Sequence, residues 1–306
     1  MASALVDNWL FATVPVVSPR GQVGTAFLVW RTHDEHTARA FLVTAGHVIR
    51  GDGSSVPEKI SCVFNTEGGG AATITLRLDA GPGGNFRQHP DEDVDVAAVE
   101  VTKVIADHPE IEKRWVDVDS FADAARRSEL DVTVGEEVLV LGYPLGLHQG
   151  DTPLPLVRQG IISSAIGSRV RDRGRTPTGP VRERALRAFL VDGATVPGAS
   201  GSPVVLKPVV GRRVHDDVVL EPAPPVLLGI MAETKYAPER DGRDEVPGFT
   251  GLGLAFEAET IEETIDMFFG GTVAGDHRSG LSDARRWVEQ VEPPPARSVL
   301  RSTPSP

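Results

Sequence analysis

A serine flanked by glycines near residue 200 is the strongest candidate for a reactive side chain in this sequence. The run VPGASGSPVV, residues 196–205, places Ser200 on a tight turn just before a strand-forming segment. Glycine lets the backbone bend sharply, so neighbouring N–H groups can point into one small space. Such groups stabilise the negative charge that develops on a carbonyl oxygen under attack. The same pattern is also typical of an ordinary Gly-Ser turn, so other residues must decide.

Two further segments contain residue types that could activate a serine. FLVTAGHVI, residues 41–49, ends an apolar strand at His47, which could accept the serine proton. DEDVDVAAVEV, residues 91–101, places Asp95 where a carboxylate could orient the imidazole. Asp93 is the rival carboxylate, and Asp95 is preferred because the apolar run follows it directly. Alone, each segment has an ordinary interpretation: a partly buried histidine and a solvated acidic loop.

The elements that must position these residues are predicted to be β-strands. Short β-branched runs lie between scattered glycines (32) and prolines (24), which is typical of an all-β sandwich or barrel. Helical patterns are few and short, at residues 121–128, 257–269 and 281–291. The end of the chain is rich in proline and serine and is expected to be largely disordered.

Composition excludes several classes of protein. The chain has 306 residues and a formal net charge of −12, which argues against nucleic-acid binding as a main role. Its single cysteine, Cys62, allows no intrachain disulfide and no cysteine metal cluster. The metallohydrolase pattern H-E-x-x-H does not occur, so no metal or other cofactor is expected. No signal-peptide pattern and no long apolar run are seen, so we expect a cytoplasmic protein with no membrane association.

Together, the three segments resemble a known family. Thr44-Ala45-Gly46-His47, Asp95-Val96-Ala97 and Gly198-Ala199-Ser200-Gly201-Ser202-Pro203 occur in the order of the chymotrypsin-like (trypsin-like) serine peptidases, closest to the bacterial HtrA-like branch. Further segments resemble strands of that family: residues 24–27, 134–147, 157–164, 227–233 and 251–261. The resemblance implies two six-stranded antiparallel β-barrels with the active site between them.

The resemblance also implies a role for each candidate residue. Ser200 would be the nucleophile, His47 the general base and Asp95 the residue that orients His47. The backbone N–H groups of Gly198 and Ser200 would form the oxyanion hole. Ser202 stands where many relatives have a second glycine, and a small side chain should be tolerated there. The implied activity is hydrolysis of peptide bonds in polypeptides through an acyl-enzyme.

Domain boundaries follow from the same resemblance. A peptidase domain would span residues 1–270, with one barrel at about 8–118, a second at about 130–256 and a terminal helix at 257–269. Residues 271–306 would form a C-terminal extension. This extension is too short for the PDZ domain that usually follows in HtrA proteins, so substrate capture or assembly through that domain is not expected.

Departures from the family pattern concern activation and specificity. Ala199 replaces the aspartate that binds a new N-terminus in relatives activated by cleavage, which argues against that kind of activation. Ala194 replaces the aspartate of trypsin-type pockets, so a preference for basic P1 residues is not supported. Aligned with the family, Ala194, Thr234, Gly253 and Ala255 would line the substrate pocket. This predicts small or apolar P1 residues.

An arginine-rich segment, residues 165–188, stands out in an acidic chain. It contains seven arginines and two acidic residues, and glycine and proline interrupt it, so it is interpreted as a long loop. We hypothesise that it binds a protein partner or regulator. The alternative is a solvated insertion, because charged runs are usually only soluble.

Two other functions compete with an endopeptidase. An esterase would use the same residues, because ester and amide hydrolysis share this mechanism. A non-catalytic or partner-activated binding module could keep the fold without constitutive activity. An intact set of His47, Asp95 and Ser200 argues against a degenerate module, and covalent labelling of Ser200 would discriminate between the two.

Overall fold

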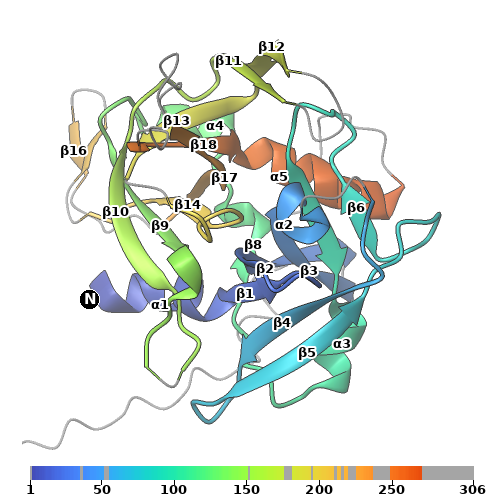
Figure 1. Cartoon of the computed structure of the whole chain (residues 1–306). Helices are drawn as coiled ribbons and strands as arrows, with labels where there is room; N and C mark the ends of the chain where they lie inside the picture. The colour runs from blue at the N-terminus through green and yellow to red at the C-terminus, as the bar shows by residue number, and fades with distance from the viewer. Residues whose placement is uncertain are drawn as a thin grey trace, which may run out of the picture.

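A computed structural model describes most of the chain. It covers residues 2–34, 37–51, 55–150, 152–175, 181–193, 196–209, 212–214, 217–219, 225–236 and 249–270. The predicted disordered extension and the helix predicted at 281–291 lie outside these residues. The described part is mostly β-structure, in agreement with the predicted class, and consists of an open sheet beside a closed barrel (Figure 1).

The open sheet comes from the N-terminal part of the chain. Its strands run in the order β5-β4-β1-β2-β3-β7-β6, and β8 pairs with β2 in parallel. They are β1 (Thr13–Val17), β2 (Val23–Asp34), β3 (Thr37–Ala45), β4 (Lys59–Asn65), β5 (Ala71–Arg77), β6 (Phe86–Gln88), β7 (Val96–Glu100) and β8 (Val116–Asp117). Strand β5 alternates between exposed and less exposed residues, whereas the first four residues of β7 are all buried. Strand β7 therefore lies in the interior, where it can hold a functional residue rigidly.

The prediction of a six-stranded first barrel needs correction. The sheet has eight strands, and the pairing between its described strands does not close into a ring. The added strand β8 has a physical reason in the length of β2, which has twelve residues. Strand β1 pairs only with its first part, up to Phe27, so Val29 and Trp30 remain available for β8.

The C-terminal sheet is a closed six-stranded barrel, as predicted for the second barrel. Its strands follow the cyclic order β10-β13-β18-β17-β14-β9. They are β9 (Glu137–Gly142), β10 (Leu156–Ile162), β13 (Ala188–Asp192), β14 (Pro203–Leu206), β17 (Leu227–Tyr236) and β18 (Phe249–Glu257). Closure leaves the barrel without an exposed sheet edge, and a separate cluster of buried apolar side chains fills it.

The arginine-rich segment is not simply a loop. Strands β11 (Val170–Arg175) and β12 (Val181–Leu186) form an antiparallel hairpin within it. The interpretation of 165–188 as a long loop was therefore wrong for its two arms, while residues 176–180 lie outside the described part. Their pairing explains the difference, because the two arms bond to each other rather than to a larger sheet. Another small hairpin joins β15 (Arg212–Val214) and β16 (Asp217–Val219).

Helices are short and lie around the two sheets. The predicted helices at 121–128 and 257–269 correspond to α4 (Ala124–Glu129) and to α5 (Ala258–Asp266) with the 3₁₀ turn η3 (Met267–Phe269). No sequence pattern predicted α1 (Ala2–Ala12), α2 (Gly46–Arg50) or α3 (Thr102–Asp107), nor the 3₁₀ turns η1 (Val118–Ser120) and η2 (Pro144–Gly146). None of the helices in the described ranges is both long enough and apolar enough to cross a membrane.

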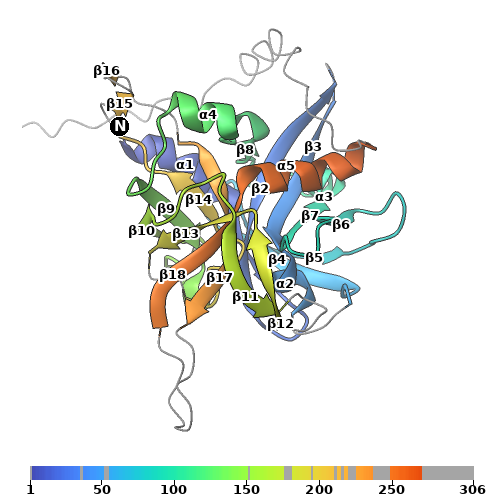
Figure 2. The same ribbon diagram turned by 90° about the horizontal axis from the view of Figure 1, so that it is seen from above.

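The two sheets share one apolar core. Its largest cluster of buried side chains includes Phe27 and Phe41 from the open sheet, Ile230 and Phe256 from the barrel, and Ile261 from α5. Figure 2 shows α5 lying across both halves of the molecule. A shared core holds the sheets in a fixed relation, which a site built from both of them requires.

Candidate active site

His47 lies where β3 gives way to α2. Strand β3 ends at Ala45 and the short helix begins at Gly46, so His47 leaves the sheet beside the start of β7. Its Nδ1 lies 2.5 Å from Oδ2 of Asp95. An ionised carboxylate can only accept hydrogen bonds, so Nδ1 donates and Nε2 is left with a lone pair. His47 can therefore accept a proton at Nε2.

Asp95 is positioned by the register between β3 and β7. Ala45 pairs with Val96, which places Asp95 beside the first residues of α2. Its Oδ1 accepts the backbone N–H of His47 at 3.0 Å, while Oδ2 faces the ring. The structure therefore places Asp95 against His47, whereas the backbone N–H of Asp93, the rival, donates to Asp91 within the preceding loop.

The electrostatics of this pair favour an ionised aspartate and a basic histidine. Burial would lower the pKa of His47, but the hydrogen bond and negative charge of Asp95 outweigh burial and raise it above its ordinary value. Burial would raise the pKa of Asp95, but its hydrogen bond with His47 and the charges of His47 and Arg50 hold it below its ordinary value. The pair is therefore suited to take up a proton on His47 and stabilise the resulting charge.

Ser200 lies on a turn that only glycine can form at two positions. Gly198 and Gly201 have φ angles of 93° and 87°. A Cβ atom would lie 2.3 Å from the carbonyl oxygen of Tyr143 at the first position and 1.8 Å from that of Thr25 at the second. The sequence pattern around Ser200 is thus required by both backbone conformation and packing.

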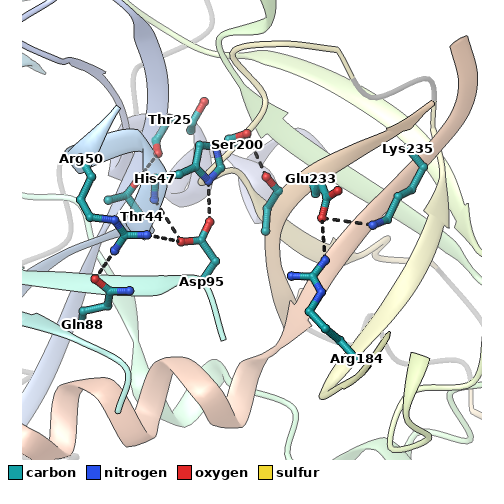
Figure 3. A network of polar contacts seen from close by, with 11 residues as sticks. Thr25, Thr44, His47, Arg50, Gln88, Asp95, Arg184, Ser200, Glu233 and Lys235 are labelled. Atoms are coloured by element: carbon teal, nitrogen blue, oxygen red, sulfur yellow. Dashed lines mark hydrogen bonds and ion pairs between the residues drawn. The ribbon is translucent and has the colours of Figure 1, made fainter. Parts of the chain in front are cut away.

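The Ser200 hydroxyl is bonded within its own barrel. Its Oγ donates to the backbone carbonyl of Ala232 on β17 at 3.1 Å (Figure 3). Among the described residues, no hydrogen bond joins this hydroxyl to His47. Both side chains nevertheless line the same cleft, whose volume is about 560 Å³. The other lining residues come from both halves: Gly21, Gln22, Val23, Gly24, Val48, Gly51, Leu145, Gly146, Pro197 and Gly198.

Thr25 connects the two halves beneath the cleft. From β2, its hydroxyl donates to the carbonyl of Gly198 at 2.8 Å and accepts the backbone N–H of Tyr143. Its own N–H donates to the carbonyl of Ser200 at 2.9 Å. Its carbonyl accepts the hydroxyl of Thr44, which lies on the strand that leads to His47. A single buried residue of the open sheet therefore fixes the backbone of the serine turn.

The backbone N–H groups of Gly198 and Ser200 lie in the turn that carries the candidate nucleophile. Within the described residues, neither group donates to a protein acceptor, whereas the intervening N–H of Ala199 donates to Val196. Two backbone donors beside a nucleophile can stabilise a developing oxyanion.

The predicted substrate-pocket residues are only partly described. Ala194 lies outside the described residues. Thr234 of β17 pairs with Gly253 of β18, while Ala255 is fully buried in the barrel core. The preference for a small or apolar P1 residue stays a prediction.

Two polar residues beside the pair were not found from the sequence. Arg50 donates from Nη2 to Oδ1 of Asp95 at 3.2 Å, and its Nη1 donates to Oε1 of Gln88. Arg50 had a weak signal, because it is a charged residue three positions after His47 at the end of an apolar run. Gln88 had none.

The arginine-rich hairpin approaches the other side of the cleft. Asp172 of β11 accepts Arg184 of β12 at 2.5 Å and Lys235 of β17 at 2.9 Å. Lys235 also lies 3.1 Å from Glu233, the residue after Ala232. The hairpin is therefore tied by charge to the strand whose carbonyl holds Ser200.

No group of three metal-ligating side chains is close enough to hold one ion in the described ranges. The arrangement that is present consists of a base, its carboxylate, a hydroxyl nucleophile and backbone donors. This set can perform acyl transfer.

Comparisons with known proteins were made with the sequence and with the fold. Among curated proteins, no sequence matches the chain. Among solved structures, the chain is similar to a serine-to-alanine variant of the HtrA-type protease AlgW with a tripeptide, with 16% identity and a TM-score of 0.50 over 89% of this chain and 65% of AlgW. It is also similar to Deg5, with 15% identity and a TM-score of 0.49 over 88% of this chain and 95% of Deg5. A serine-to-alanine mutant of Rv3671c from M. tuberculosis, in its inactive form, has 15% identity and a TM-score of 0.46 over 89% of this chain and 93% of that chain.

At these identities, the structural matches show the fold alone. The family comparison is more specific, because the trypsin-like peptidase domain matches residues 24–208. That range contains His47, Asp95 and Ser200 and exceeds half of the chain. The chain therefore belongs to the family of trypsin-like peptidases, whose fold is that of the chymotrypsin-like serine proteases.

Proposed function

We propose that the chain is a serine endopeptidase that cleaves polypeptides through an acyl-enzyme, with His47, Asp95 and Ser200 as its triad. The main observation behind this proposal is that Ser200 and the His47–Asp95 pair meet at one cleft, although they come from different sheets. Family membership supports peptide-bond hydrolysis. We also propose that it belongs to the HtrA-like branch, with the boundaries 1–270 and 271–306 given above.

The first step would transfer one proton and form one bond. Rotation of the Ser200 side chain would exchange its hydrogen bond with Ala232 for one with Nε2 of His47. As Oγ attacks the scissile carbonyl carbon, Nε2 takes the hydroxyl proton and the carbonyl π electrons move to oxygen. The N–H groups of Gly198 and Ser200 would stabilise this oxyanion, while Asp95 stabilises the imidazolium.

Collapse of the tetrahedral intermediate would then break the C–N bond. The leaving amine takes the proton from Nε2, and the acyl group stays on Ser200. Water repeats the sequence, giving its proton to His47 and releasing the carboxylic acid with Ser200 restored. The predicted pocket residues are Ala194, Thr234, Gly253 and Ala255, and such a pocket would favour a small or apolar P1 side chain.

A partner-activated state is the second candidate function. The observation that favours it is the hydrogen bond from Ser200 to Ala232, which holds the hydroxyl away from His47. A partner bound to the arginine-rich hairpin could act on this contact through Lys235 and Glu233, which lie on the same strand as Ala232. The hairpin is therefore also the proposed site for a regulator.

Labelling of the purified chain with a fluorophosphonate would test the proposal. A covalent adduct on Ser200 in the wild type, and none in Ser200→Ala or His47→Ala, is expected for an assembled site. Labelling that appears only after the addition of a polypeptide partner would favour partner activation. An adduct that persists in Ser200→Ala would contradict the assignment of the nucleophile.

A further inference from the structure

Arg50 is a buried cation at the edge of the candidate triad. Its side chain is only 5% exposed, compared with 44% for His47. It lies about one helical turn after His47, at the end of α2. A buried guanidinium needs hydrogen-bonding partners, and here these are Asp95 and Gln88. The first of these partners is the carboxylate that holds His47.

We propose that Arg50 is a positioning residue that fixes Asp95 toward His47 and offsets part of the negative charge that the imidazole meets (Figure 3). The inference rests on the proposed function, because it concerns the same triad. It extends that function to a residue that never touches the substrate and acts only through Asp95.

The two oxygens of Asp95 have separate tasks. Oδ2 accepts from the His47 ring, whereas Oδ1 accepts from the His47 backbone N–H and from Nη2 of Arg50. Rotation of the carboxylate would break the bonds at Oδ1, so Arg50 holds Oδ2 in place for the ring. Gln88 of β6 holds the far side of the guanidinium and thereby fixes Arg50 itself.

Gly46 provides the space for this arrangement. A Cβ atom at position 46 would lie 2.7 Å from Oδ1 of Asp95 and 3.0 Å from Nη1 of Arg50. The glycine in T-A-G-H is therefore matched to an arginine three residues after the histidine. Together, Gly46, Arg50 and Gln88 form a polar brace around one face of Asp95.

The charges around His47 explain what the brace does electrostatically. Three charged groups act on the ring: Asp95 and Glu233 favour its protonated form, and Arg50 disfavours it. Without Arg50, only the carboxylates of Asp95 and Glu233 would remain of these three charged groups. It would then stay protonated to higher pH and be a poorer general base near neutrality.

Titration of His47 by NMR in the full-length chain tests this directly, without any need for activity. Arg50→Gln removes the charge, and we expect the His47 midpoint to rise by roughly 0.5 to 1 pH unit. Arg50→Lys keeps the charge, so its midpoint should stay close to the wild-type value. Arg127→Gln is the matched control, because Arg127 is similarly buried but pairs with Glu259 away from the triad. An unchanged His47 midpoint in Arg50→Gln would overturn the inference that Arg50 offsets negative charge at the imidazole.

The rate of fluorophosphonate labelling tests the positioning part. Arg50→Lys and Gln88→Leu should each label Ser200 about three- to tenfold more slowly, because a looser Asp95 orients His47 less well. Arg127→Gln should label at the wild-type rate. Wild-type rates in both Arg50→Lys and Gln88→Leu would overturn the positioning role, and this test remains decisive if Arg50→Gln does not fold. If the His47 midpoint shifts as expected but neither the wild type nor any variant is labelled, the result contradicts the peptidase proposal and leaves the role of Arg50 intact.

Discussion

The two halves of the cleft hold their reactive groups in different ways. In the open sheet, His47 and Asp95 are joined by side-chain and backbone hydrogen bonds and braced by Arg50. In the closed barrel, Ser200 is held by its backbone, while its hydroxyl donates to Ala232 of the same barrel. The acid–base half is thus assembled within one sheet, whereas the nucleophile has its hydrogen bond within the other. Catalysis would depend on rigid backbone across the boundary and on one mobile hydroxyl.

The largest expected effect comes from breaking the assembled half at Asp95. Asp95→Asn should lower kcat by about 10⁴-fold, because an amide favours the wrong imidazole tautomer and cannot stabilise the imidazolium. Peptide hydrolysis measured under saturating substrate would show this loss. Asp93→Asn is the control and should retain nearly full activity. A large loss in the control with little loss in Asp95→Asn would reverse the assignment.

The next largest effect comes from the serine turn. Gly201→Ala places a Cβ atom 1.8 Å from the carbonyl oxygen of Thr25 at a φ of 87°, so the turn must move away from the open sheet. We expect about a hundredfold slower labelling of Ser200, since small misplacements of reacting groups are costly.

Gly135→Ala separates conformational strain from this clash. Gly135 has a similar φ of 94°, and no atom lies within 4 Å of the place where the alanine Cβ would stand, so only the strain of a left-handed residue is added. The variant should lose about 1 kcal/mol of stability and keep its labelling rate. Equal labelling in Gly135→Ala and Gly201→Ala would show that the close approach to Thr25 has no role.

A smaller effect is expected at the connection between the halves. Thr25→Val removes the hydroxyl that bonds to Gly198 and Tyr143 while preserving side-chain shape. The buried N–H of Tyr143 and the partly buried carbonyl of Gly198 lose their partner, and we expect a fall of about tenfold in kcat/KM together with lower stability. Thr25→Ser keeps the hydroxyl and should recover most of the activity. No recovery in the serine variant would mean that packing by the methyl group, rather than the hydrogen bonds, fixes the turn.

The same contrast explains which features could be predicted from sequence. His47, Asp95 and Ser200 each lie next to the end or the start of a strand, and the order of their motifs along the chain, which resembles that of a known family, allowed them to be proposed together. Arg50 and Gln88 meet only because β6 pairs with β7 and brings Gln88 opposite Ala97. The carbonyl of Ala232 has no side-chain signal at all. Contacts that depend on register between distant strands could not be read from one sequence.

Fold prediction succeeded and failed for related reasons. The second barrel is closed by six strands, as predicted, whereas the first sheet gains β8 because β2 extends past β1. In the arginine-rich segment, the charged composition favoured a loop. The two arms pair along their backbones, and Val170 and Leu186, which lie opposite each other, pack on the apolar core. Arg184 and Lys235 neutralise Asp172 between β11, β12 and β17, so charge pairing adds to this packing.

The last predicted effect is one on stability and concerns the helix that spans both halves. Glu263 of α5 accepts both guanidinium nitrogens of Arg187, at 2.7 and 2.8 Å, and faces Nε2 of His89 at 3.0 Å. Arg187 precedes β13 of the barrel and His89 follows β6 of the open sheet, so one carboxylate ties the two regions together. Burial would raise the pKa of Glu263, but the hydrogen bonds from His89 and Arg187 outweigh it and lower the pKa to about 2.

This lowered pKa fixes the direction of the pH dependence. An unfolded glutamate has a pKa near 4.5, so the contribution of Glu263 to stability is complete above that value and is lost as the pH falls toward about 2. We expect roughly 1 to 2 kcal/mol, because the group is partly exposed and solvent screens it. Urea unfolding of wild type and Glu263→Gln should therefore differ near neutral pH and converge in acid. A constant difference across this range would mean that Glu263 acts by packing rather than by charge, and that its carboxylate adds no charge-based tie between the two halves.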